Sequence, residues 1–127
     1  MKTTYRRIND ALRALQPLMQ IKGLSGRTQI ALMRHWRSLA AEGTVYGDAE
    51  MAAVRAFGSL RDDGKTVKFK SPDAERAYLE RIAEMLNAET EISPVSITDD
   101  AALYEHTTPD TWAALDGFIV MEEGGNK

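Results

Sequence analysis

The sequence predicts a mainly α-helical protein with a small β element: a long helical hairpin, a short two- or three-stranded sheet and C-terminal helices. Apolar residues recur at helical spacing across most of the first 60 residues. An Asp-Gly turn signal then precedes the short β-type segment "TVKF". Two later segments, "SPD" and "TPD", combine a capping side chain, a proline and an acidic residue, which is typical of a helix start.

At 127 residues the chain fits one domain with a modest core. We divide it into a basic helical hairpin (1–60), an acidic helix-strand region (61–121) and a polar tail (122–127). Residues 1–70 hold 13 Lys or Arg against 6 Asp or Glu, whereas residues 71–127 hold 3 against 13. Such asymmetry indicates association, either with a charged partner or between the two halves, within one molecule or between copies.

The first helix is expected in "YRRINDALRALQPLMQ". Its apolar residues recur at i, i+4, i+7 and i+11 and form one helical face: Ile8, Leu12, Leu15 and Met19. Pro17 lacks a backbone donor and should kink or end this helix. The segment "KGLSGR" then makes a tight connection, in which Ser25 is placed to cap the next helix.

The second helix begins in "GRTQIALMRHWRSLAAEG" and is amphipathic. Its apolar side chains fall within about 120° of arc at 100° per residue: Leu32, Met33, Trp36, Leu39 and Ala40. Arg27, Arg34 and Arg37 cluster on the other side. One face is therefore expected to pack, and the other to meet a partner or solvent.

The length of this helix depends on Gly43 and Gly47, which look like helix breakers. The phase of the apolar face nevertheless continues 18 residues later, which is five whole turns: Met51, Val54, Phe57 and Gly58. We expect one helix from Arg27 to Leu60, with the glycines where another backbone comes close, so that Gly47→Leu should overpack the structure. The alternative is two helices with a turn at "EGTVYGD" and Asp48 as the second cap.

The second half alternates short strands and helices. "TVKF" may pair with the edge-strand segment "ETEISPVSIT", and Ser71 caps a helix between them. Thr108 caps a short helix that runs through Leu115 and stops at Gly117, before the apolar segment "FIVM". The expected core is Ile8, Leu12, Leu15, Leu32, Trp36, Leu39, Val54, Phe57, Tyr78, Ile82 and Leu86.

The order of these elements resembles a group of small uncharacterised proteins of tailed bacteriophages. The resemblance is carried by the basic helix pair and by the segments "DGKTVKF", "YLERIAEMLNAETEISPVSI" and "TPDTWAALDGFIV". It covers most of the chain as a pattern of elements. The glycines of "EGTVYG" depart from the charged, glycine-poor helix of that group. The resemblance implies a phage or prophage gene and brings no catalytic residues with it.

The motifs of the common enzyme classes are missing. Cysteine is absent, "GLSGRT" lacks the P-loop lysine, and there is no G-x-S-x-G elbow. Asp99, Asp100, Glu105 and His106 could bind a cation, but a solvated acidic loop is the simpler interpretation. His35 is expected to be a hydrogen-bonded residue at the core boundary. We therefore expect no enzyme, no cofactor and no bound metal.

Two binding functions remain. The first is a phage interaction protein, a virion or assembly component or a host-takeover factor, which acts through protein contacts or self-association; the exposed "FIVM" end would suit such contacts. The second is nucleic-acid binding through Arg27, Arg34 and Arg37, joined by Arg6 and Arg13. No apolar run reaches the ~20 residues that span a membrane, so the expected location is the host cytoplasm or the virion, away from membranes.

Overall fold

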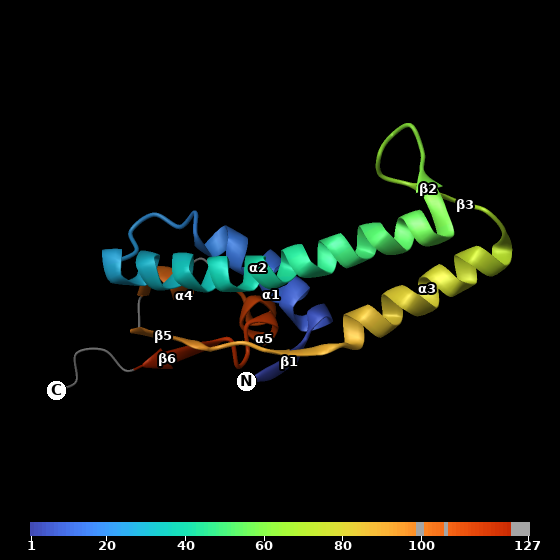
Figure 1. Cartoon of the computed structure of the whole chain (residues 1–127). Coiled ribbons are helices and arrows are strands. Elements are labelled where there is room, and N and C mark those ends of the chain that lie inside the picture. The colour runs from blue at the N-terminus through green and yellow to red at the C-terminus, as the bar shows by residue number, and fades with distance from the viewer. Residues whose placement is uncertain (99–100, 106, 123–127) are drawn as a thin grey trace.

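The computed structural model describes residues 1–98, 101–105 and 107–122 of an elongated, mainly helical molecule (Figure 1). Its elements in chain order are β1 (Lys2–Thr4), α1 (Tyr5–Leu18), α2 (Gly26–Phe57), β2 (Gly58–Leu60), β3 (Val67–Phe69), α3 (Pro72–Asn87), β4 (Glu89–Glu91), β5 (Val95–Thr98), α4 (Ala101–Glu105), α5 (Pro109–Ala114) and β6 (Ile119–Glu122). The predicted fold class, mainly α with a small β element, is confirmed. Residues 123–127 of the predicted polar tail lie outside the described residues.

The helical hairpin is formed by α1 and α2, which pack on each other. The Thr4 side chain caps α1 by accepting a hydrogen bond from the amide of Arg7. Pro17 lies in the last turn and the helix ends at Leu18, as expected from the missing backbone donor. The predicted cap at Ser25 is also confirmed, because its hydroxyl oxygen accepts from the amide of Thr28.

The second helix is continuous across both glycines, as predicted, but it ends at Phe57 and not at Leu60, because Gly58–Leu60 forms a strand that pairs with β3. It runs for 32 residues, which is about 48 Å at 1.5 Å per residue. A Cβ built on Gly43 would lie 3.0 Å from Cδ1 of Leu12, so α1 approaches α2 closely at this glycine. The same interpretation is wrong at Gly47, where a Cβ would have no atom within 4 Å.

Replacing Gly47 by alanine should therefore stabilise the protein, by about 0.5–1 kcal/mol. Alanine restricts the unfolded chain and favours the helix, and its methyl group meets open space. Urea unfolding monitored by circular dichroism measures this difference. Gly43→Ala is the matched control and should gain less, because its methyl group must displace the Leu12 side chain. A loss of stability in Gly47→Ala would contradict the open environment.

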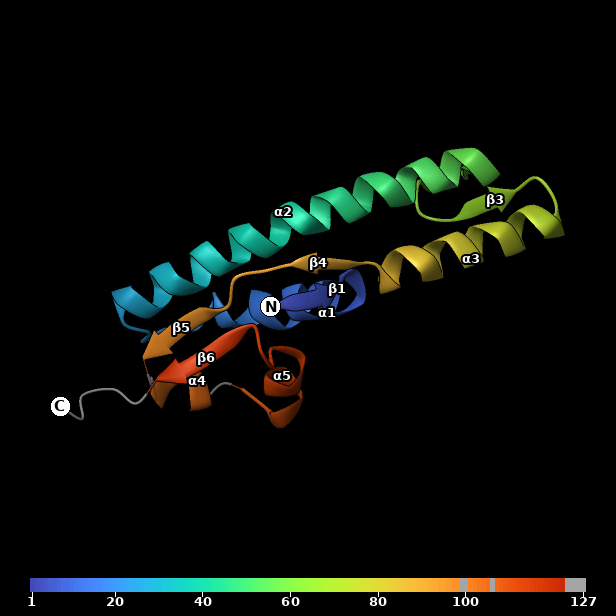
Figure 2. The ribbon, with the colours of Figure 1, turned by 60° about the horizontal axis from the view of Figure 1, so that its bottom comes forward.

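The C-terminal half of α2 and α3 lie side by side and carry the β2–β3 hairpin at their far end; we call these four elements the arm (Figures 1 and 2). Ser71 caps α3 by accepting from the amide of Ala74. In the hairpin turn, Gly64 adopts a φ of 70° and the Asp63 carboxylate accepts from the amide of Lys65. The guanidinium of Arg81 lies over the ring of Phe57, 5.0 Å from its centroid, so a side chain of α3 stacks on an aromatic ring of α2.

The β element differs from the prediction in its pairing. Strand β3 pairs antiparallel with β2, and segment 89–98 is divided between two other partners. Strand β4 pairs antiparallel with β1, with Thr3 opposite Thr90, whereas β5 pairs in parallel with β6. The structure therefore has three two-stranded sheets instead of one sheet. A strand of three or four residues has too few side chains to specify its partner. The packing of the helices brings particular strands next to each other and so determines which of them pair.

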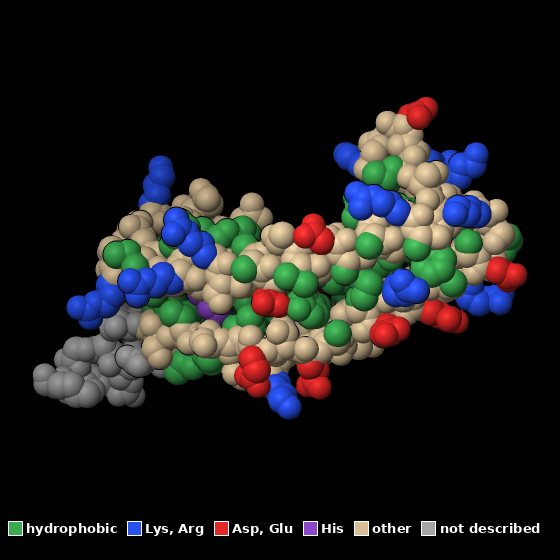
Figure 3. Space-filling view, in the orientation of Figure 1, with side chains coloured by type: hydrophobic (Ala, Val, Ile, Leu, Met, Phe, Trp, Pro, Cys, Tyr) green, Lys and Arg blue, Asp and Glu red, His purple; other side chains and the backbone are tan. Residues whose placement is uncertain are grey.

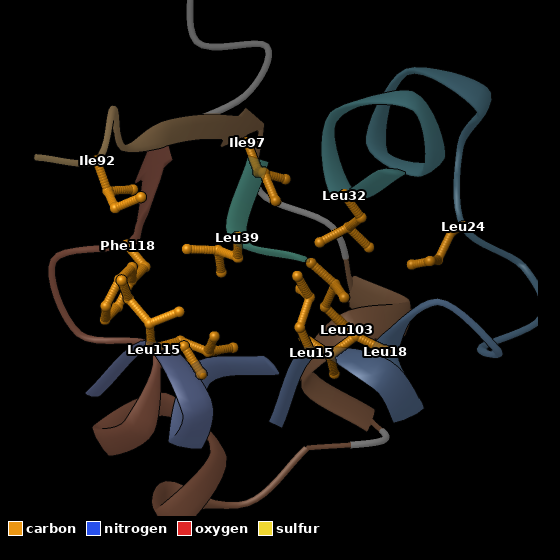
Figure 4. Packing of buried hydrophobic residues seen from close by; sticks show 12 residues of the cluster. Leu15, Leu18, Leu24, Leu32, Leu39, Ile92, Ile97, Leu103, Leu115 and Phe118 are labelled. Carbon is orange, nitrogen blue, oxygen red and sulfur yellow. The ribbon is translucent and has the colours of Figure 1, made fainter. Parts of the chain in front are cut away.

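The main core lies between α1, the first half of α2 and the C-terminal segments (Figure 4). The fully buried large side chains are Ile8, Leu15, Leu18, Leu32, Leu39, Ile97, Leu103, Leu115 and Phe118. Of the predicted core, Ile8, Leu15, Leu32, Leu39 and Val54 are buried, whereas Leu12, Trp36, Phe57, Tyr78, Ile82 and Leu86 are only partly buried. The expected exposed end "FIVM" is only partly correct, because Phe118 has no solvent-accessible surface and Ile119 packs against the core, whereas Val120 is 48% exposed.

Candidate functional site

Three arginines lie together on the solvent side of the first half of α2. Arg27, Arg34 and Arg37 fall within about 80° of arc and are all exposed. They lie opposite Leu32 and Leu39, which are buried against α1 and the C-terminal segments. Among the described residues none of the three forms an ion pair. The solvent side of this part of α2 therefore carries positive charge that no described carboxylate neutralises.

Two apolar side chains share this surface. Ile30 is 58% exposed and lies between the arginines, three residues after Arg27 and four before Arg34. Met33 is 44% exposed, although the sequence placed it in the buried stripe. We call these five residues, Arg27, Ile30, Met33, Arg34 and Arg37, the arginine face. Figure 3 shows hydrophobic side chains between the basic ones at the end where α2 begins.

Ile30 was not among the predicted site residues, because it lies outside the apolar stripe of the helix. The buried stripe is centred on Leu32, His35 and Leu39, and so is rotated away from Met33. The sequence signal that could have identified Ile30 is its spacing. Ile30, Arg34 and Arg37 stand at i, i+4 and i+7, so they share one helical surface.

A shallow cavity of about 220 Å³ adjoins the arginine face. It is lined by Met19, Leu24, Gln29, Leu32 and Met33. Apart from Gln29, its walls are apolar, and Met33 belongs to both the cavity and the arginine face. This arrangement can receive an apolar side chain next to a row of positive charges, and it offers no nucleophile or general base.

The structure does not bring the arginines of α1 into this face. Arg13 pairs with Asp10 at 3.0 Å and its Nε donates to the carbonyl of Asn9. Arg6 lies near Tyr46, where its charge opposes the rise of the tyrosine pKa. Tyr46 is nine residues beyond Arg37 along α2, which is about 13.5 Å. Arg6 and Arg13 are therefore separate from the arginine face.

A group of tyrosines and carboxylates joins the core to the arm. The Tyr5 hydroxyl donates to Oε1 of Glu42 at 2.7 Å, and the Tyr5 and Tyr46 rings stack with centroids 6.3 Å apart. Burial and the nearby Glu50 raise the pKa of Tyr46 to about 12. The phenol stays protonated at neutral pH, so this group acts as a structural joint and not as a base.

His35 is a core residue, which corrects the expected boundary position. It is 3% exposed, its ring centroid lies 6.2 Å from that of Phe118, and its Nε2 has no hydrogen-bond partner in the described part of the chain. Burial lowers the pKa of His35, because the charged imidazolium would lose its hydration. No substrate can reach this imidazole, so it is not a catalytic candidate.

This buried imidazole should make folding sensitive to acid. The unfolded chain takes up a proton as the pH falls through 6.5, whereas the folded chain resists, so the unfolded state binds more protons in this range. The contribution of His35 to stability is complete above pH 6.5 and is lost below it. His35→Leu should remove this dependence, and chemical unfolding at several pH values measures it. Parallel pH profiles for the two proteins would contradict the assignment.

The metal hypothesis rests largely on residues that lie outside the described ranges, namely Asp99, Asp100 and His106. Within the described ranges, no three histidine or acidic side chains gather as a metal site. No described helix is both long and apolar enough to cross a membrane.

Comparisons of the chain with protein-family models, with curated proteins and with solved structures returned no match.

Proposed function

We propose that this protein is a non-enzymatic interaction protein, and that the arginine face binds an acidic protein surface. The observation that carries the proposal is Ile30, more than half exposed, in the middle of three arginines that form no ion pair with another described residue. Arginine and methionine are enriched at protein interfaces, and arginine is frequent among the residues that dominate binding energy. An apolar centre inside a charged rim fits this composition.

The biological setting that we propose is a phage or prophage, with the protein acting as a virion or assembly component or as a host-takeover factor. This setting rests on the order of the sequence elements and their resemblance to small tailed-phage proteins. It places the protein in the bacterial cytoplasm or in the virion. The net charge of -3 and the basic-acidic division of the chain support association with other proteins over free diffusion along nucleic acid.

Nucleic-acid binding by the same face is the second candidate. Arg27 and Arg37 lie ten residues apart, about 15 Å along the helix, so three phosphate contacts are within reach. Two features count against it. Phosphates offer nothing apolar for Ile30 and Met33 to contact, and the acidic residues of α3 and β4 repel a long polyanion.

Titration of the wild-type protein with random duplex DNA separates the two candidates. We expect no gel shift at physiological salt, and no linear fall of log affinity with log salt at about -0.9 per phosphate contact. Tight, salt-sensitive DNA binding that disappears in the triple variant Arg27→Glu, Arg34→Glu, Arg37→Glu would overturn the proposal. Circular dichroism of the triple variant should match the wild type, because the three side chains lie opposite the core.

A further inference from the structure

The exposed side of α3 carries a row of carboxylates. Asp73, Glu80 and Glu84 are exposed and fall within about 40° of arc. Leu79 is also exposed, but it points about 100–140° away from these carboxylates around the helix. The Asp73 carboxylate lies 3.8 Å from the Arg76 guanidinium, a long ion pair between two exposed groups that contributes little to stability. We call Asp73, Glu80 and Glu84 the acidic face.

The acidic face and the arginine face of one molecule cannot meet. The arginine face is at the start of α2, whereas α3 packs against the other half of α2 in the arm (Figures 1 and 2). The exposed charges of the two faces are opposite in sign. Two complementary surfaces at opposite ends of one chain are suited to contact between copies.

We propose that the arginine face binds the acidic face of a second copy of this chain, so that copies associate head to tail. This proposal rests on the proposed function, because it requires that the arginine face binds protein. It adds the identity of the partner, which is a second copy of the chain.

Residue spacing supports an antiparallel pairing of the two helices. An antiparallel register that places Arg27 opposite Glu84 keeps the other charged residues of the two faces in step along the helices.

The same register aligns a second charge pair at the other end of the contact. Arg37 is ten residues beyond Arg27, and Asp73 is eleven residues before Glu84. The corresponding distances are about 15 and 16.5 Å, and Arg34 can reach Glu80 between them.

The local charges favour this pairing. Residues 26–41 contain three arginines and no acidic residue, whereas residues 72–91 contain six acidic residues and two arginines. Exposed pairs of this kind select the partner and its orientation more than they add affinity, while Ile30 and Met33 can bury apolar surface in the contact. Because the contact joins different surfaces of the two copies, it repeats from copy to copy and builds chains or rings.

Sedimentation velocity of the purified full-length protein tests the proposal across a wide concentration range at low and high salt. We expect the average mass to rise above that of the monomer with concentration, and to fall again at high salt because exposed charges are screened. Arg27→Glu with Arg34→Glu reverses one face, and Glu80→Lys with Glu84→Lys reverses the other. Each double variant alone should associate at least about tenfold more weakly than the wild type.

A mixture of the two double variants is the decisive sample. The reversed faces match each other, and the two unchanged faces also match, so the mixture should associate again. Arg13→Glu with Lys65→Glu lowers the net charge by the same amount as the arginine-face variant, at sites outside both faces, and it should associate like the wild type. Circular dichroism checks that all variants are folded.

Three results would overturn the inference: a wild type that remains monomeric at low salt, folded double variants that still associate like the wild type, or a mixture that stays monomeric. A monomeric wild type that also fails to bind DNA removes the self-association and leaves the proposed protein contact in place. DNA binding at physiological salt overturns the proposed function itself, so the two failures are distinguishable.

Discussion

Replacing Phe118 by alanine should lower the free energy of unfolding by about 3–5 kcal/mol. The side chain is fully buried, its ring lies 6.2 Å from that of His35, and the Arg7 guanidinium lies 5.2 Å from its centroid. Truncation leaves a cavity among groups from α1, α2 and the C-terminal segment. Urea unfolding followed by circular dichroism measures the loss.

Val120 is the matched control for this prediction. It lies two residues further along the same segment, in β6, and is 48% exposed. Val120→Ala should change the stability by no more than about 0.5 kcal/mol. If the two substitutions lowered the free energy of unfolding equally, the Phe118 side chain would not be packed in the core.

Replacing Val45 by proline should destabilise the protein by about 3 kcal/mol or more. Val45 is 54% exposed and lies between Gly43 and Gly47, inside the continuous helix. Proline removes one backbone hydrogen bond and its ring collides with the preceding turn, while no apolar contact of importance is lost. The unfolding free energy and the amide exchange of residues 44–57 report the damage.

Val45→Ala separates the backbone effect from the loss of the side chain and should be nearly neutral or slightly stabilising, because alanine favours a helix. A tolerated proline would mean that the chain turns near residue 45 instead of continuing as one helix. That outcome would also detach the arm from the core and remove the basis for a head-to-tail arrangement.

Local signals in the sequence were sufficient for the helices. Ser25, Ser71 and Thr108 each cap the helix that they were expected to cap, because capping depends only on a side chain and an amide three residues away. The continuity of α2 was equally readable, since the phase of its apolar residues persists over five turns. Gly43 and Gly47 look alike in sequence, and only the position of Leu12 distinguishes them.

The arginine face was predicted in part. Three arginines on one side of a helix follow from spacing alone, whereas the exposure of Ile30 and Met33 depends on how far the helix is rotated against α1 and β5. The packing of Leu32, His35 and Leu39 sets that rotation, which places His35 in the core. The position of Arg6 and Arg13 apart from this face follows from the docking of α1.

By itself, the sequence determined the fold class, the starts of α2, α3 and α5, the continuity of α2 and the separation of basic from acidic residues, because each depends on neighbours within a few turns of the chain. Only the tertiary structure decided that Phe118 is core, that β1 pairs with β4 and β5 with β6, and that two oppositely charged faces lie at opposite ends of the molecule. These features join residues up to a hundred positions apart. Short strands and single apolar side chains do not specify such partners until the helices have packed.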